Sequence, residues 1–188
     1  MDKSAMRSSF LTKRTQLNPQ RVSQGSLQIC EHLLGFILEQ ATSQVCLFKS
    51  IKNEPRLEFL AEILFERLPL GLPVVLSDKE MEFHRWKRND VLKTNKWGIP
   101  EPSPRRAPKM VPDERTVVVI PCLAVDKKGI RLGFGKGYYD IYLAKYPQVV
   151  SIAVAFDEFI VDELPLDDWD KPVQWIGSEK GLLKPSRE

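Results

Sequence analysis

Residues 116–140 read Thr-Val-Val-Val-Ile-Pro-Cys-Leu-Ala-Val-Asp-Lys-Lys-Gly-Ile-Arg-Leu-Gly-Phe-Gly-Lys-Gly-Tyr-Tyr-Asp. The first five residues are mainly apolar without alternation, which is typical of a central strand in a parallel sheet. The stretch then reaches three alternating glycines, Gly133, Gly135 and Gly137, and the apolar stripe of a helix follows them. A buried strand, a glycine loop and a helix in this order predict an α/β fold.

Helical and strand patterns alternate on both sides of this stretch. The periodicity predicts helices at 3–17, 19–39, 56–68 and 138–146, and strands at 44–48, 72–77, 81–86, 116–120, 149–156 and 173–177. We therefore expect a three-layer α/β fold with a mainly parallel central sheet and helices on both faces. Residues 1–188 fit one domain, in which about 90–114 form a long Pro-rich loop and about 181–188 a loose tail.

Composition excludes several classes of function. The 188 residues are 43% hydrophobic and 28% charged, as in an ordinary globular protein, and a net charge of +3 is too small for a nucleic-acid-binding surface. No apolar run approaches the roughly 20 residues that span a bilayer, and no signal peptide is evident. Three separated cysteines predict neither zinc nor disulfides. We expect a cytoplasmic monomer that acts on small molecules, without nucleic-acid or membrane partners.

The glycine loop admits two interpretations. Arg131 and Lys136 flank it, and a glycine loop that leads into a helix N-terminus can hold a phosphate by its backbone N–H groups. The known phosphate patterns do not match: a P-loop needs Ser or Thr where Gly137 follows the lysine, and the dinucleotide motif needs a longer last spacing. The alternative is a glycine-rich hairpin end that only starts a helix.

The first predicted helix carries three cations away from its apolar side. Met6 and Phe10 mark the apolar side, whereas Lys3, Arg7 and Arg14 lie elsewhere. Lys3 and Arg7 are i and i+4 neighbours, so they project from one face and repel each other unless an anion lies between them. They form either a solvated face or part of an anion site.

Three further features also stay open. His84 falls on the polar face of its predicted strand and is expected at the surface. Trp97, in the Pro-rich loop, is either a core plug or one wall of a pocket for a flat ring. The acidic residues of 157–170 either promote solubility or provide a carboxylate that faces the phosphate site through a metal.

Four motifs in order give the chain a family resemblance. The run 121–140 resembles the signature of 5-formyltetrahydrofolate cyclo-ligases, also called methenyltetrahydrofolate synthetases. Lys3-x-x-Met-Arg7, residues 97–102 (Trp-Gly-Ile-Pro-Glu-Pro) and Leu164-Pro165 with Asp170 occur in the order and at the spacing of the same family. The resemblance covers most of the chain.

The resemblance implies a ligase that uses ATP and Mg²⁺ to convert 5-formyltetrahydrofolate to 5,10-methenyltetrahydrofolate, with release of ADP and phosphate. ATP would phosphorylate the formyl oxygen, N10 would attack the formyl carbon, and phosphate would leave. Such chemistry needs positioning and charge stabilisation above all.

The same resemblance implies roles for individual residues. The implied catalytic residues are Lys136, Arg131 and Tyr138. The implied ATP site comprises Lys3, Arg7, Arg131, Leu132, Gly133, Phe134, Gly135, Lys136, Gly137, Tyr138 and Tyr139. Substrate contacts are implied for Lys49, Glu54, Trp97, Phe134 and Tyr138. Magnesium contacts are implied for Asp140 and Asp170.

Several positions depart from the family pattern and keep a second hypothesis open. Pro-Arg-Leu at 55–57 follows Glu54 where an acidic residue and a threonine are common, and Cys122, Trp169 and Gln174 replace other residue types. The alternative function is a divergent relative that binds folate or nucleotide without catalysis, or an ATP-dependent enzyme with another substrate.

Overall fold

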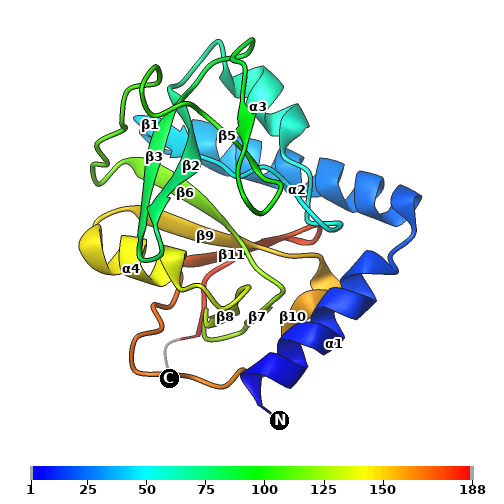
Figure 1. Ribbon diagram of the computed structural model, residues 1–188. Helices are drawn as coiled ribbons and strands as arrows, with labels where there is room; N and C mark the ends of the chain where they lie inside the picture. Colours follow the sequence, from blue (N-terminus) through cyan, green and yellow to red (C-terminus); the bar gives the residue numbers. More distant parts are fainter. Residues whose placement is uncertain (1, 187–188) are drawn as a thin grey trace.

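The computed structural model describes residues 2–186 (Figure 1). Its helices are α1 (Lys3–Thr15), α2 (Pro19–Glu39), α3 (Glu58–Leu64) and α4 (Tyr138–Lys145), with a 3₁₀ turn η1 (Asp157–Phe159). Its first six strands are β1 (Gln44–Cys46), β2 (Leu70–Ser77), β3 (Glu80–Trp86), β4 (Lys93–Thr94), β5 (Pro100–Glu101) and β6 (Thr116–Pro121). The others are β7 (Ala124–Asp126), β8 (Arg131–Leu132), β9 (Val150–Val154), β10 (Ile160–Val161), β11 (Trp175–Ser178) and β12 (Gly181–Leu183).

The largest sheet has seven strands in the order β12-β11-β9-β6-β1-β2-β3. Its five inner strands are parallel, and one antiparallel strand closes each edge. Strand β6 lies in the middle, and residues 116–120 are all buried, as its continuous apolar pattern predicts. The predicted α/β fold with a mainly parallel sheet is confirmed.

Connection handedness places helices on both faces of this sheet. The crossover from β1 through α3 to β2 and the crossover from β6 through α4 to β9 run in opposite directions across the sheet. Because both crossovers are expected to be right-handed, α3 and α4 lie on opposite faces. Helix α2 packs against α3 and β11 on the α3 face, and α4 packs near β3 (Figure 1).

The strand order reverses between β1 and β6, so the loops that leave their carboxyl ends diverge there. Open α/β sheets bind ligands at such a crevice. The loop 47–57 follows β1, and the segment 122–137 follows β6 and carries the glycine loop. The sheet therefore brings the two predicted substrate regions to one edge of the fold.

A small second core attaches α1 to this edge. Strands β10, β7 and β8 form a three-stranded sheet, and the apolar side chains of α1 pack on its buried residues. Met6 and Phe10 supply these contacts, as the apolar side predicted for the helix requires. Asn18 caps the next helix by accepting a hydrogen bond from the Gln20 N–H, and Pro19 takes the first helical position.

Two predicted elements have other bounds in the structure than the sequence predicts. The helix predicted at 56–68 is regular only over Glu58–Leu64 and continues as turns to Leu68. The predicted loose tail is wrong for residues 181–183, because they pair antiparallel with β11 and form an edge strand. Residues 187–188 of that predicted tail lie outside the described part.

His84 is buried, not exposed as its position in an alternating strand predicted. Residues 107–110 of the Pro-rich loop run along β3: the Arg85 N–H donates to the Pro108 carbonyl at 2.8 Å. The Ala107 carbonyl oxygen lies 2.8 Å from Nδ1 of His84. The long loop is thus partly ordered by sheet pairing, and it also holds the short β4–β5 hairpin.

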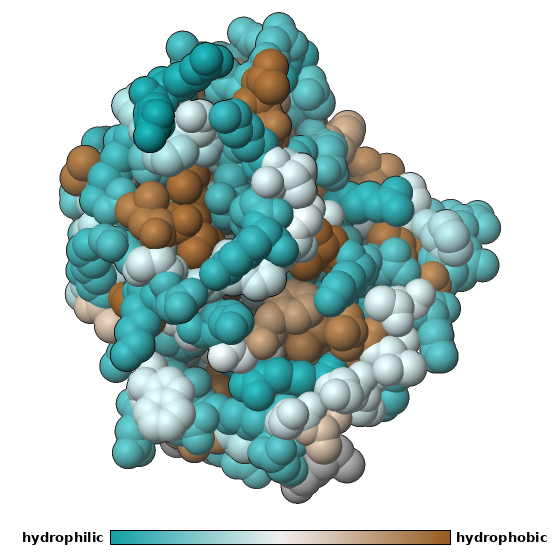
Figure 2. All heavy atoms as spheres, in the orientation of Figure 1, coloured by the Kyte–Doolittle hydropathy of each residue, from teal (hydrophilic) through white to brown (hydrophobic). Residues whose placement is uncertain are grey.

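The surface of the protein carries both hydrophilic and apolar side chains. The face shown in Figure 2 is largely hydrophilic, and small apolar patches interrupt it. Cys30, Cys46 and Cys122 are buried free thiols. Within residues 2–186, no helix has both the length and the apolar composition that crossing a membrane requires.

Candidate active site

The glycine loop joins β8 to α4 and has an open side. Gly135 (φ +89°) and Gly137 (φ +69°) have left-handed backbone conformations that favour glycine. A Cβ atom built at Gly133 or Gly137 would meet no atom within 4 Å, so both face free space. Lys136, between them, is exposed. A ligand can therefore reach the main chain of this loop without steric hindrance.

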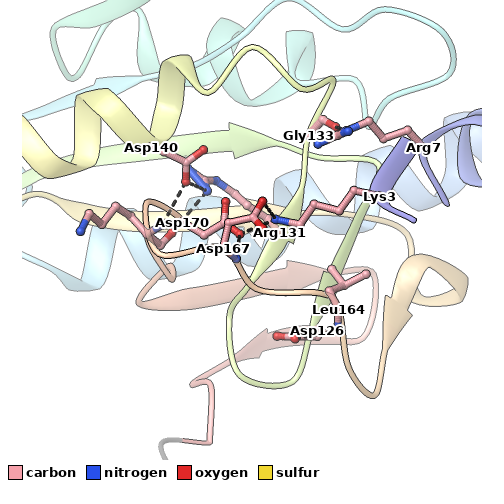
Figure 3. Close-up of polar contacts among 10 residues, drawn as sticks. Lys3, Arg7, Asp126, Arg131, Gly133, Asp140, Leu164, Asp167 and Asp170 are labelled. Atoms are coloured by element: carbon pink, nitrogen blue, oxygen red, sulfur yellow. Dashed lines mark hydrogen bonds and ion pairs between the residues drawn. The ribbon is translucent and has the colours of Figure 1, made fainter. Parts of the chain in front are cut away.

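Helix α1 closes the other side of the loop. The Arg7 Nε donates to the Gly133 carbonyl oxygen at 3.0 Å, and a Cβ at Gly135 would lie 3.2 Å from the Arg7 guanidinium carbon. Arg7 thus comes from the start of the chain to the middle of the predicted site (Figure 3). Its conformation depends on the absence of a side chain at Gly135.

Lys3 joins the same site through the acidic segment. Its ammonium donates to Oδ2 of Asp167 and to Oδ2 of Asp170, each at 2.6 Å (Figure 3). Burial alone would lower the pKa of Lys3, but the two carboxylates outweigh burial and raise the pKa above its ordinary value. The acidic segment therefore contributes specific ion pairs and not only solubility.

Arg131 and Asp140 form the second ion pair of the site. Nη1 of Arg131 donates to Oδ1 of Asp140 at 2.8 Å, and the Lys171 N–H donates to the same oxygen at 3.0 Å (Figure 3). Among the described residues, Nη2 of Arg131 and the Tyr138 hydroxyl are buried without a hydrogen-bond partner. Unsatisfied buried donors are rare, so they suit a site that a ligand completes.

Asp126 holds the acidic segment against the glycine loop. This residue is buried, and its carboxylate accepts hydrogen bonds from the N–H groups of Lys128, Ile130 and Leu164 at 2.9 to 3.0 Å. The first two bonds shape the β7–β8 turn, and the third fixes the chain that leads to Asp167 and Asp170 (Figure 3). Asp126 was not among the predicted site residues, although its place in a turn before Gly129 is a signal.

Asp140 and Asp170 are the predicted magnesium ligands, and their hydrogen bonds show which of their oxygens are available to an ion. Asp140 and Asp170 each have one oxygen occupied by ion pairs and backbone donors and a second oxygen without a hydrogen-bond donor in residues 2–186. The described chain has no group of three or more potential metal ligands. Mg²⁺ is commonly held by one or two carboxylates together with phosphate oxygens and water, so this donor set fits the ion.

Glu54 lies across the crevice, in the loop that follows β1. Its side chain is 2% exposed, and Oε2 accepts a hydrogen bond from the Ile51 N–H at 3.0 Å. Burial raises the pKa of Glu54 to about 7, against the opposing effect of Arg14. A surface hollow of about 580 Å³ opens beside it, lined by residues 50–54 with Arg56 and Glu58.

Arg14 is a residue that the sequence prediction missed. It is 1% exposed, and its guanidinium Nη2 lies 3.4 Å from Oε1 of Glu54. Lys3, Arg7 and Arg14 are spaced by four and seven residues, so they lie along one face of a helix. That spacing was the available signal, but an arginine on a polar face is usually exposed.

Two aromatic residues pack against each other where α4 begins. The rings of Trp97 and Tyr138 meet edge to face with centroids 6.1 Å apart, and Trp97 is 38% exposed. Trp97 is therefore not a core plug, and its position suits a pocket wall. Phe134, 42% exposed, lies below the cations of Arg14 and Lys52 at 5.6 and 5.5 Å from its centroid.

The remaining predicted residues vary in their surroundings. Leu132 is buried in the second core, so only its main chain can contribute. Tyr139 is partly buried, and desolvation raises the pKa of its hydroxyl above the ordinary value. Lys49 places its ammonium 4.8 Å from the Trp86 centroid and 3.6 Å from Oε1 of Glu58, so its contacts give no support to its predicted role. The roles of all these residues stay predictions.

Comparisons with known proteins show the family of the chain. The family model described as the 5-formyltetrahydrofolate cyclo-ligase family matches residues 1–179. A 5-formyltetrahydrofolate cyclo-ligase from Mycolicibacterium smegmatis is 32% identical over 182 residues, which cover 89% of either chain.

Two solved structures are also similar. The 5,10-methenyltetrahydrofolate synthetase of Aquifex aeolicus has a TM-score of 0.85 at 30% identity and covers 100% of this chain and 94% of its own. The synthetase of Mycoplasma pneumoniae has a TM-score of 0.73 at 28% identity and covers 95% and 99%. The chain is therefore a member of the 5-formyltetrahydrofolate cyclo-ligase family, whose members are enzymes of the ligase class.

Proposed function

We propose that the protein uses ATP and Mg²⁺ to convert 5-formyltetrahydrofolate to 5,10-methenyltetrahydrofolate, with release of ADP and phosphate. One observation carries the proposal: the glycine loop, which contains Lys136 and follows Arg131, has an open side at Gly133 and Gly137, and the Arg7 guanidinium donates to its Gly133 carbonyl oxygen. Cations and free backbone N–H groups at a helix N-terminus suit a polyphosphate.

The proposed reaction has two steps on the folate. The formyl oxygen attacks the γ-phosphorus of ATP, the bond to the β-phosphate oxygen breaks, and ADP leaves. N10 then attacks the formyl carbon, the carbon–oxygen bond breaks with loss of phosphate, and the N10 proton passes to solvent. Phosphorylation is needed because a formyl oxygen bound to an amide-like carbon is a poor leaving group.

The cations of the site serve the first step. Lys136 and Arg131 lie where negative charge spreads over the transferred phosphoryl group, and fixed cations there stabilise the transition state. Asp140 and Asp170 would hold Mg²⁺, which neutralises phosphate charge when it is bound. Because Arg131 and Lys3 are ion-paired with these aspartates, nucleotide binding has to exchange carboxylate partners for phosphate oxygens.

The crevice beside Glu54 serves the folate. Glu54 is among the residues that line the hollow, and a carboxylate can accept hydrogen bonds from the N–H groups of a pterin edge. Trp97, Tyr138 and Phe134 offer partly exposed rings at the boundary between this hollow and the glycine loop. Flat aromatic surfaces there can hold N10 close to the formyl carbon.

The test combines purified protein, Mg·ATP and 5-formyltetrahydrofolate, and follows the near-ultraviolet band of the methenyl product together with ADP. We expect both to grow together and to stop when ATP is omitted. Absence of product with retained ATP binding would refute the proposed reaction and favour a non-catalytic relative or an enzyme with another substrate. The departures from the family pattern at residues 55–57 are the reason to consider these alternatives.

A further inference from the structure

The guanidinium of Arg14 spans the crevice where the strand order reverses. Nε donates to the Lys52 carbonyl oxygen at 3.0 Å, and Nη1 donates to the Cys122 carbonyl oxygen at 2.7 Å. The first carbonyl belongs to the loop after β1 and the second to the chain that leaves β6. The remaining nitrogen, Nη2, lies 3.4 Å from the Glu54 carboxylate. One buried side chain thus connects both loops that form the crevice.

The loop that carries Glu54 depends on this connection. Lys52 and Asn53 have positive φ angles of 49° and 58°, which are uncommon in residues other than glycine and persist only where the surroundings hold them. The Asn53 amide donates to the carbonyls of Arg14 and Thr15 at 3.2 Å each, while Arg14 donates to Lys52. The end of α1 and the loop therefore clamp each other from both sides.

The same helix also reaches the glycine loop. Lys3 contacts the acidic segment, Arg7 contacts Gly133, and the Arg14 guanidinium lies over the ring of Phe134 in the glycine loop. Eleven residues separate Lys3 from Arg14, which corresponds to about 16 Å along a helix. Helix α1 is thus a single rigid element that contributes Lys3 and Arg7 to the predicted nucleotide side and Arg14 to the predicted folate side.

We propose that Arg14 is the positioning residue for Glu54, and that it sets the affinity of the enzyme for the reduced folate without contacting ATP. This inference rests on the proposed function and adds to it a residue that determines substrate binding. A guanidinium suits the task because its rigid planar fork spreads five N–H donors over three nitrogens and so reaches two carbonyls and a carboxylate in different directions, whereas an ammonium carries its donors on one nitrogen.

The test measures KM for 5-formyltetrahydrofolate and for ATP in Arg14→Met, Arg14→Lys and a matched control, Lys13→Met, on the exposed side of the same turn. Arg14→Met should raise the folate KM by about tenfold or more, because a buried carboxylate loses its partner, and leave the ATP KM within about twofold. Arg14→Lys, which keeps the charge but not the fork, should fall between. Lys13→Met should match the wild type.

A second arm separates positioning from general stability. In a Glu54→Gln background, Arg14→Met should change the folate KM by less than about twofold, because the two residues act as one unit. The proposal is overturned if the effects of Arg14→Met and Glu54→Gln on the folate KM are fully additive. It is also overturned if Arg14→Met raises both KM values equally, or if folded Arg14→Met has an unchanged folate KM. If Arg14→Met does not fold, as melting followed by circular dichroism would show, Arg14→Lys decides between the same outcomes.

The wild-type reaction distinguishes this proposal from the proposed function. If the wild type forms no methenyl product, the proposed reaction is refuted, and binding of 5-formyltetrahydrofolate by calorimetry takes the place of KM. Binding that weakens about tenfold in Arg14→Met and little in Lys13→Met supports the role of Arg14. Failure of the wild type to bind the folate overturns it.

Discussion

Lys136 is the exposed cation between the two glycines that adopt positive φ angles. We expect Lys136→Ala to lower kcat/KM by about a hundredfold or more, because a fixed charge near the transferred phosphoryl group acts mainly in the transition state. Steady-state kinetics with Mg·ATP and 5-formyltetrahydrofolate measure the effect. Lys145→Ala, in the last turn of α4, removes an equal charge away from the loop and serves as the control. Near-normal kcat/KM in Lys136→Ala would contradict the assignment.

Glu54 gives the second residue-scale prediction, a pH dependence of stability. Burial raises the pKa of Glu54 from 4.5 to about 7, so between these values the folded protein binds a proton that the unfolded chain releases. The stability contributed by this group is greatest below 4.5 and is lost as the pH rises through 7. Glu54→Gln lacks this titration.

Denaturant unfolding of both proteins at pH 5, 6, 7 and 8 provides the measurement. The free energy of unfolding of the wild type, minus that of Glu54→Gln, should fall as the pH rises. A difference that stays constant or increases would show that Arg14 keeps the carboxylate charged at all these values.

The sequence singled out candidate site residues, whose roles stay predictions, but it did not predict the burial of Arg14 and His84. Lys3 and Arg7 could be proposed because their motif matches a family; Arg7 donates to the glycine loop, and Lys3 pairs with Asp167 of the acidic segment. Arg14 and His84 could not be placed, because each lies on the polar side of its own element. Segments distant in sequence cover them: the loop after β1 covers Arg14, and residues 107–110 cover His84.

At the scale of elements, Gly137 and Gly133 of the glycine loop are expected to be required for different reasons. Gly137 needs a positive φ angle, whereas Gly133 does not, and a Cβ would meet nothing at either position. Gly137→Ala should therefore destabilise the protein by about 1 kcal/mol through backbone strain. Gly133→Ala should leave the melting temperature unchanged and weaken ATP binding, because its methyl group occupies the open side of the loop.

Thermal melting and an ATP titration of both variants check this prediction. Equal loss of stability in the two variants would mean that the open side of the loop matters for folding. Unchanged ATP affinity in Gly133→Ala would place the nucleotide elsewhere.

The elements themselves were predictable where the signal is local. Asn18-Pro19 marks the start of α2, and the apolar run 116–120 marks the central strand, as the structure confirms. Strand β12 was not predictable, because residues 181–183 are ordered by antiparallel pairing with β11 and not by their own pattern. The short β4–β5 hairpin was also missed, because the prolines around it favour an irregular loop.

At the scale of the molecule, Arg7 from the first helix contacts the glycine loop, Arg131 precedes this loop in the chain, and Lys136 lies within it. In the proposed function they bind the polyphosphate and not the base. We expect Mg·ATP at saturating concentration to raise the melting temperature by several degrees, and Mg·AMP to raise it far less. A thermal shift assay with both nucleotides measures this, with Lys145→Ala as the control that should keep the ATP response. Equal shifts with AMP would assign recognition to the adenosine moiety.

The two antiparallel edges of the large sheet have a consequence for how the chain behaves at high concentration. An open sheet edge offers unpaired backbone groups on which another chain can add a strand. Here the outer side of β3 is engaged by residues 108–110, and β12 is only three residues long, with Pro185 close behind it. Strand addition between copies is therefore disfavoured at both ends, so the folded protein should resist aggregation during concentration and storage.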